Sequence, residues 1–145
     1  GLPAFLTANG RLNSGYMIAQ YTAASLVSEN KVLSHPARVD SIPTSANQED
    51  HVSMGNAAGL KLAQVLSNVE RVVAIELLCA TQGVDFLRPR RPGTGACALA
   101  ELVRRDVPYL EDDRILGDEI ELIAQKITTR EFLADLEAGM GFTLQ

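Results

Sequence analysis

The chain has 145 residues, of which 46% are apolar and 21% charged, with a formal net charge of −5. This composition is that of one soluble globular domain, and the acidic balance argues against a nucleic-acid partner. The sequence has no uninterrupted apolar stretch of membrane-spanning length, so no membrane partner is expected. Cys79 and Cys97 lie in apolar runs without a Cys-x-x-Cys spacing, which favours buried thiols in a cytoplasmic protein.

The first predicted helix covers residues 14–33, with Asn13 or Ser14 as its N-cap. Residues 15–28 carry no charged side chain. A helix without a polar face is normally buried on all sides, and a chain of this size seldom encloses a helix so completely. We therefore expect part of this helix to contact other protein.

The second predicted helix covers residues 53–87 and follows a polar loop at residues 39–51. His35 precedes Pro36, which ends the first helix because the residue before proline is disfavoured in the α conformation. An unbroken second helix would be roughly 50 Å long, whereas a compact domain of this length has a diameter of about 40 Å. These lengths predict that the chain is part of a larger helical assembly.

Residues 88–93 contain two prolines and a glycine and mark the clearest internal boundary. They include the basic cluster of the chain, formed by Arg88, Arg90 and Arg91. Because the cluster is short and interrupted by Pro89, we interpret it as a solvated linker.

Shorter helices with charged faces are predicted beyond this boundary. Thr94 can cap a helix at 96–105, Asp118 a helix that ends near residue 127, and Thr128 a helix that ends near residue 138. No segment shows the alternation of a strand. The fold class predicted is all-α, with long antiparallel helices of a larger helical bundle and a peripheral set of short helices.

A short polar stretch before the second long helix carries the candidate site residues, Gln48, Glu49, Asp50 and His51. A carboxylate in a cleft can hold an ammonium or imidazolium group or accept a proton, which makes Glu49 the main candidate. Glu49 could equally be a helix-terminus carboxylate or half of an interface ion pair, and Gln48 could bond only to loop backbone. Asp50 is interpreted as a cap and His51 as a structural histidine. A zinc site needs three or four ligands, so no metal site is predicted.

Four segments of the chain, residues 13–24, 28–31, 35–37 and 39–55, resemble the C-terminal part of aromatic amino acid ammonia-lyases, and most closely their histidine branch. The resemblance extends from residue 1 to about residue 138. It implies a mostly α-helical homotetramer whose long helices combine into a central bundle. It also implies elimination of ammonia by an electrophilic methylidene-imidazolone that forms autocatalytically from Ala-Ser-Gly. In the histidine branch the substrate is L-histidine and the product is urocanate.

The resemblance assigns a role to Glu49 in particular. Histidine-specific members of the family carry Gln-Glu-Asp-His, as residues 48–51 do here, whereas phenylalanine and tyrosine lyases commonly have glutamine in place of the glutamate. Glu49 is therefore expected to be catalytic and substrate-binding, with Gln48 as a substrate-binding neighbour. Tyr16 stands where the family usually has phenylalanine. Tyr16 and Tyr21 are both expected in the core with hydrogen-bonded hydroxyls.

No Ala-Ser-Gly triplet occurs in the chain, so the methylidene-imidazolone is expected in an N-terminal portion outside it. The chain begins with Gly1, as a fragment or processed product would, and alone it is expected to be inactive. Residues 1–87 would supply core-bundle helices and the active-site loop, and residues 94–138 peripheral helices. Two alternatives remain open: part of a tyrosine or phenylalanine ammonia-lyase or aminomutase, and a non-catalytic helical oligomerisation module.

Overall fold

The computed structural model describes residues 1–49 and 55–140 and shows an all-α fold. Its elements are a short 3-10 helix η1 (Ala4–Leu6) and the helices α1 (Met17–Leu33), α2 (Gly55–Phe86), α3 (Thr94–Asp106), α4 (Gly117–Thr128) and α5 (Glu131–Met140). Residues 1–49 and 55–140 contain no strand, only an isolated antiparallel bridge between Thr44 and Glu49. The prediction of the fold class is confirmed. None of the helices in these ranges has the length and hydropathy to cross a membrane.

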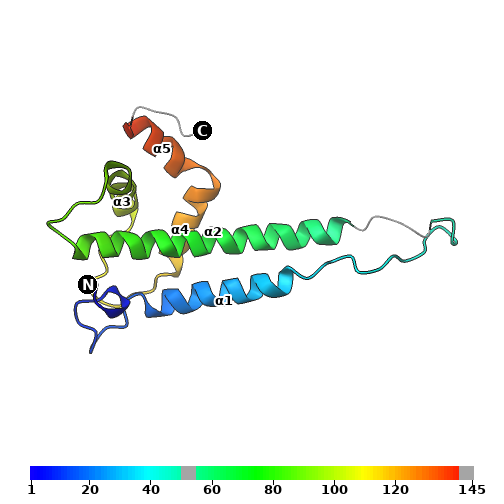
Figure 1. Ribbon diagram of the computed structural model, residues 1–145, viewed down its shortest axis with the longest axis horizontal. Helices are drawn as coiled ribbons and strands as arrows, with labels where there is room; N and C mark the ends of the chain where they lie inside the picture. Colours follow the sequence, from blue (N-terminus) through cyan, green and yellow to red (C-terminus); the bar gives the residue numbers. More distant parts are fainter. Residues whose placement is uncertain (50–54, 141–145) are drawn as a thin grey trace.

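The two long helices, α1 and α2, lie side by side and run antiparallel (Figure 1). α2 is unbroken over 32 residues, which makes it roughly 48 Å long. α1 begins at Met17, three residues after the predicted start, and ends at Leu33 as predicted. Residues 34–49, which follow α1, project beyond the ends of the two helices as a long arm (Figure 1).

α3 and α4 pack on α2 toward the end that lies opposite the arm, and α5 packs on α3 and α4, so the short helices form a second layer (Figure 1). Leu78 of α2, Val103 of α3 and Ile123 of α4 are fully buried at the centre of this contact, and Phe132 of α5 closes it. Burying a large apolar side chain contributes roughly 1.5–3 kcal/mol, so this layer is where the chain gains most of its packing energy. That α1 and α2 join a central bundle stays a prediction.

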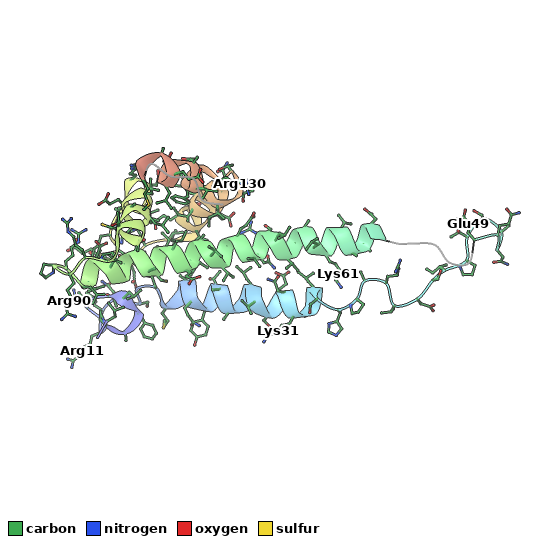
Figure 2. All side chains as sticks on the ribbon, turned by 45° about the horizontal axis from the view of Figure 1, so that its top comes forward. Arg11, Lys31, Glu49, Lys61, Arg90 and Arg130 are labelled. Atoms are coloured by element: carbon green, nitrogen blue, oxygen red, sulfur yellow. The ribbon has the colours of Figure 1, made fainter. Side chains whose placement is uncertain are left out.

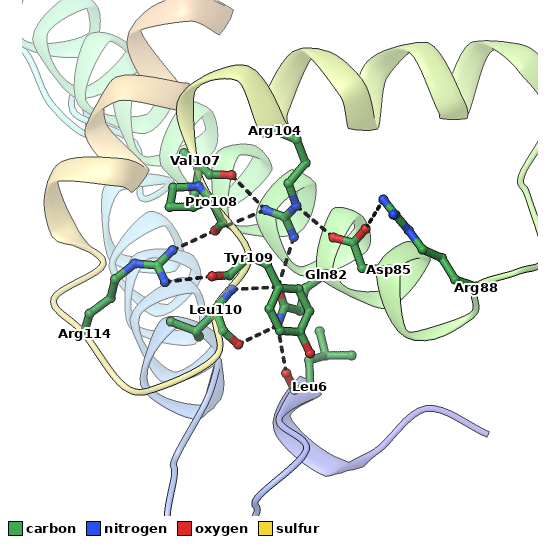
Figure 3. Close-up of polar contacts among 10 residues, drawn as sticks. All are labelled: Leu6, Gln82, Asp85, Arg88, Arg104, Val107, Pro108, Tyr109, Leu110 and Arg114. Carbon is green, nitrogen blue, oxygen red and sulfur yellow. Dashed lines mark hydrogen bonds and ion pairs between the residues drawn. The ribbon is translucent and has the colours of Figure 1, made fainter.

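A buried amide links the N-terminal segment to the second layer (Figure 3). Gln82 is fully buried, and its Nε2 donates to the carbonyls of Leu110 at 2.9 Å and Leu6 at 3.3 Å. Its Oε1 accepts from the Leu110 N–H at 3.2 Å and from Arg104 Nη2 at 3.0 Å. All the bonding capacity of this amide is used, so η1, α2 and α3 are held in one arrangement.

The N-cap residue of α1 makes no side-chain capping bond, so the predicted local cap is wrong, and a distant residue holds the segment before the helix. Tyr16 is the N-cap residue and makes no side-chain capping bond. The carboxylate of Asp113 instead accepts the N–H groups of Ser14 at 2.7 Å and Gly15 at 2.8 Å, and these bonds lower its pKa. Asn13 donates to Asp112 Oδ1 at 3.1 Å.

The predicted caps of the short helices are also wrong. Thr94 is the first residue of α3, whose N-cap is Gly93, and Asp118 lies inside α4, whose N-cap is Leu116. Thr128 is the last residue of α4, and its hydroxyl donates to a carbonyl of that helix. The helices themselves form where the apolar pattern predicts them.

The two tyrosines of the first apolar run have different environments. Tyr16 is 2% exposed, as predicted, but its hydroxyl has no partner among the described residues. Tyr21 is 65% exposed, so its expected core position is wrong for this chain. Ala19 is the buried residue of α1, and the chain does not enclose this helix.

Candidate functional site

The main candidate residue, Glu49, lies at the end of the arm that follows α1 (Figure 2). At the base of the arm, Lys61 of α2 donates from Nζ to the backbone carbonyl of His35. Further along, the Asp40 carboxylate accepts the N–H of Ser41 at 2.7 Å. Glu49 lies at the far end, well beyond the helices (Figure 2). The arm therefore carries its polar residues away from the packed part of the chain.

A tight turn sets the backbone at the tip of the arm. The N–H of Thr44 donates to the carbonyl of Glu49 at 2.7 Å, and the N–H of Glu49 donates back at 3.3 Å. Ser45, Ala46 and Asn47 between them have φ values of 52°, 56° and 68°. The left-handed conformation costs a non-glycine residue roughly 1–2 kcal/mol, so the tip is strained by about 3 kcal/mol or more.

The side chains of Gln48 and Glu49 make little use of their bonding capacity. Glu49 is exposed, and its Oε2 accepts one hydrogen bond, from the hydroxyl of Thr44 at 3.4 Å. Gln48 is exposed, and its side-chain amide bonds to no described residue, while its N–H donates to the Ser45 carbonyl at 3.2 Å. A carboxylate and a carboxamide are thus available together. Their predicted roles stay predictions.

Two neighbouring candidates, Asp50 and His51, lie outside the described residues. The structure therefore places Gln48 and Glu49 on one turn and leaves the interpretations of Asp50 as a cap and His51 as a structural histidine as predictions.

Glu49 needs a surface beyond its own arm to form a binding cleft. Three cavities, of about 690, 580 and 430 Å³, lie on the packed part of the chain, and neither Gln48 nor Glu49 lines any of them. A fully hydrated carboxylate binds a cation weakly, because water competes for both charges. An enclosed ligand at Glu49 therefore requires protein surface that the described residues do not supply.

No group of three or more His, Cys, Asp or Glu side chains in the described part of the chain could hold a metal ion. Cys79 and Cys97 are both free thiols. Burial raises the pKa of the Cys79 thiol to about 11, which keeps it protonated and unreactive at neutral pH.

All three arginines of the cluster after α2 are exposed, as the interpretation as a solvated linker requires, and one of them also forms an ion pair. Arg88 Nη2 lies 2.8 Å from Asp85 Oδ1, and Arg104 of α3 donates to the other oxygen of Asp85 at 2.8 Å (Figure 3). The cluster lines the cavity of about 580 Å³. The spacing of three residues between Asp85 and Arg88 was the local signal for the first pair. The contact with Arg104 depends on the packing of α3.

Comparison with known proteins by sequence and comparison by structure point to the same family. Residues 1–105 match the aromatic amino acid lyase family. Histidine ammonia-lyase from Natranaerobius thermophilus is 55% identical over 141 residues, which are 97% of this chain and 28% of that protein. Histidine ammonia-lyase from Trypanosoma cruzi superposes with a TM-score of 0.89 at 50% identity, over 94% of this chain and 27% of the other.

A related enzyme with a different reaction is also similar in structure. Tyrosine aminomutase from Streptomyces globisporus superposes with a TM-score of 0.89 at 39% identity, over all of this chain and 27% of the other. The chain thus spans little more than a quarter of the length of the relatives it matches. The family match covers well over half of the sequence, and the fold agrees with it. The chain belongs to the aromatic amino acid lyase family.

Proposed function

We propose that this chain is part of a histidine ammonia-lyase, which eliminates ammonia from L-histidine to give urocanate. The observation that carries the proposal is Glu49, a carboxylate available at the tip of an arm in a sequence 55% identical to a histidine ammonia-lyase. A carboxylate suits a substrate that carries an imidazole, because it can pair with the imidazolium or accept its proton.

In this proposal Glu49 is the residue of this chain that contacts the substrate. Its carboxylate either holds the imidazole ring or takes part in proton transfer. Gln48, whose amide can donate and accept, orients the substrate or Glu49 beside it. Both residues would act in a cleft that is completed by protein surface from outside the described residues, since the arm alone offers no enclosure.

The family's electrophile would come from elsewhere in the protein. A methylidene-imidazolone supplies the electrophilic centre that activates the substrate for loss of ammonia. This chain contains no Ala-Ser-Gly triplet from which the group could form. We therefore expect no histidine-dependent release of urocanate by this polypeptide alone.

A homo-oligomer, and specifically a tetramer, is part of the proposal. Its support is the large apolar surface that α1 and α2 leave exposed, together with the position of Glu49 on a projecting arm (Figure 2). An arm of this kind can deliver its tip to another subunit. A cytoplasmic location is also proposed, with the free thiols of Cys79 and Cys97 as its support.

The second candidate function is that of a tyrosine or phenylalanine lyase or aminomutase, and a structural similarity supports it. The similarity to tyrosine aminomutase covers the whole chain, but at 39% identity against 50% for the histidine ammonia-lyase structure. Incubation of the intact protein with each amino acid separates the two: urocanate from histidine supports the proposal, and a β-amino acid or a cinnamate from tyrosine or phenylalanine supports the alternative.

The first prediction tests Glu49 itself in the intact protein. Glu49→Gln keeps the shape of the side chain but removes its charge and most of its basicity. We expect kcat with histidine to fall at least about a hundredfold, the range of a lost acid–base or charge-pairing group. The melting temperature should stay nearly the same, because the carboxylate makes one long hydrogen bond.

Glu111→Gln is the matched control. Glu111 is also exposed, its carboxylate bonds to no described residue, and it lies on the packed part of the chain. The control should keep its turnover. Near-normal kcat for Glu49→Gln would show that Glu49 is not the chemical residue of this chain.

A further inference from the structure

A cavity of about 580 Å³ opens between the end of α2, the loop at residues 87–93 and one face of α3. This volume is in the range of sites for small organic ligands. Six charged side chains are among the residues that line it: Asp85, Arg88, Arg90, Arg91, Glu101 and Arg104. The lining has two more cations than anions, although the chain as a whole carries a net charge of −5.

The contacts between these groups leave two arginines free. Asp85 is fully engaged by Arg88 and Arg104, each at 2.8 Å (Figure 3). Arg104 is also bonded to the carbonyl of Val107 at 3.0 Å, so it has a structural role. Arg90 and Arg91 line the same cavity and form no side-chain hydrogen bond or ion pair with any described residue.

The remaining anion does not neutralise these two arginines. Glu101 lies on α3 and has one contact, from the thiol of Cys97 at 3.6 Å, and no ion pair within the described residues. The positive charge of Arg90 and Arg91 is therefore uncompensated inside a concave surface, where guanidinium groups bind oxyanions well.

The backbone that carries the two arginines is held in place. The N–H of Arg90 donates to the carbonyl of Leu87 at 3.0 Å, and the N–H of Arg88 donates to that of Asp85 at 3.3 Å. Pro89 and Pro92 restrict the chain on either side. A loop ordered before binding loses less entropy when a ligand arrives. The acidic residue that α3 contributes to the cavity wall is Glu101.

We propose that this cavity binds a small phosphate-class oxyanion through Arg90 and Arg91. A phosphate group carries up to two negative charges and presents oxygens in several directions, which matches two free guanidinium groups. The site lies at the end of α2 opposite the arm that carries Glu49 (Figure 2), so within one chain it is remote from the residue proposed to contact the amino acid substrate.

The test is calorimetric titration of the intact protein with inorganic pyrophosphate, at constant ionic strength maintained with chloride. We expect saturable binding below about 10 mM, and a loss of at least about tenfold in affinity for the double variant Arg90→Gln, Arg91→Gln. The variant Arg90→Lys, Arg91→Lys keeps the charge without the bidentate geometry and should bind with intermediate affinity.

The double variant Arg105→Gln, Arg130→Gln is the charge-matched control, since both residues lie on the described surface outside this cavity. It should bind pyrophosphate as the unmodified protein does. Equal affinity of the Arg90, Arg91 variant and the control would overturn the proposal, as would the absence of saturable binding. Tighter binding of citrate than of pyrophosphate would overturn the choice of phosphate.

Discussion

The side chain of Tyr16 is 2% exposed, and its hydroxyl has no hydrogen-bond partner among the described residues. A buried hydroxyl without a partner costs roughly 1–3 kcal/mol of desolvation. Burial also raises the pKa of Tyr16 to about 12, against a smaller lowering effect of the positive charge of Arg104. The ring contributes to the core, whereas the oxygen atom opposes folding.

Tyr16→Phe is therefore expected to raise the free energy of unfolding of the intact protein by about 1 kcal/mol at pH 7. The gain should grow above pH 10. The raised pKa means that the native tyrosine keeps its proton while the unfolded one loses it, so stability of the unmodified protein falls as pH rises from 10 toward 12. At pH 10.5 the difference should reach about 2 kcal/mol in urea unfolding.

Cys79 ionises in the same alkaline range but is present in both proteins, so it cancels in the comparison. Tyr109→Phe is the control at pH 7. Tyr109 is 38% exposed and should change stability by less than about 0.5 kcal/mol. A loss of stability in Tyr16→Phe would mean that its hydroxyl has a partner.

Glu49 illustrates what residue patterns can predict about the site. The residue types and the family resemblance are enough to identify Glu49 and Gln48 as the candidates. Neither their exposure nor their place at the tip of an arm follows from the polar stretch alone, because the arm depends on where α1 and α2 end. In the proposed function a further surface completes the cleft, and the polar stretch around Glu49 carries no signal for it.

At the scale of elements, the start of α1 depends on one glycine. Gly15 has φ of +55°, and a Cβ built on it would lie 2.3 Å from the carbonyl oxygen of Phe5 and 3.0 Å from Cβ of Thr7. Gly15→Ala is expected to destabilise the intact protein by at least about 2 kcal/mol, from the left-handed conformation and the backbone shift that relieves the contact. Thermal and urea unfolding would measure the loss.

Gly139→Ala is the matched control, because Gly139 lies in α5 and a Cβ there meets no atom within 4 Å. Replacing a glycine by alanine in the interior of a helix raises the free energy of unfolding by roughly 0.5–1 kcal/mol. Equal effects of the two substitutions would show that Gly15 does not hold the conformation described.

The helices agree with the sequence predictions better than their caps do. Apolar spacing is a property of each segment, so the ends of α2 fall within about two residues of the predicted ones. A cap depends on whichever acceptor comes near. Asp113 holds the residues just before α1 from a position 98 residues beyond Gly15, and no local pattern could indicate it. The cavity beside Arg90 could not be predicted from local sequence for the same reason, because α3 forms one wall of it and the cavity depends on how that helix packs.

At the scale of the whole molecule, the chain has a packed side and an unpacked side. α2 is covered by the short helices toward one end, and the part toward the arm is accompanied only by α1 (Figure 1). Large apolar side chains remain exposed on the two long helices: Ile18, Tyr21, Val27, Val32, Leu60, Leu62, Leu66 and Val69. Exposed apolar surface of this extent is characteristic of protein interfaces.

We therefore predict that the intact protein is an oligomer whose subunits meet through α1 and α2. Val32 is 70% exposed and Leu60 66% exposed, so replacing both with glutamate should cost little within one chain. In an interface each substitution would bury an unpaired charge, which is strongly unfavourable. Sedimentation velocity should then show smaller species for the variant Val32→Glu, Leu60→Glu than for the unmodified protein at the same micromolar concentration.

Leu12→Glu provides the comparison, because Leu12 is 81% exposed but belongs to neither α1 nor α2. It should leave the sedimentation coefficient unchanged. If the protein with both helix substitutions sediments as the unmodified one does, α1 and α2 do not form the interface. In that case Glu49 would need its enclosing surface from the same polypeptide, because the arm would have no neighbouring subunit to enter. Measuring assembly and histidine turnover on the same variant therefore tests the interface and the shared active site together.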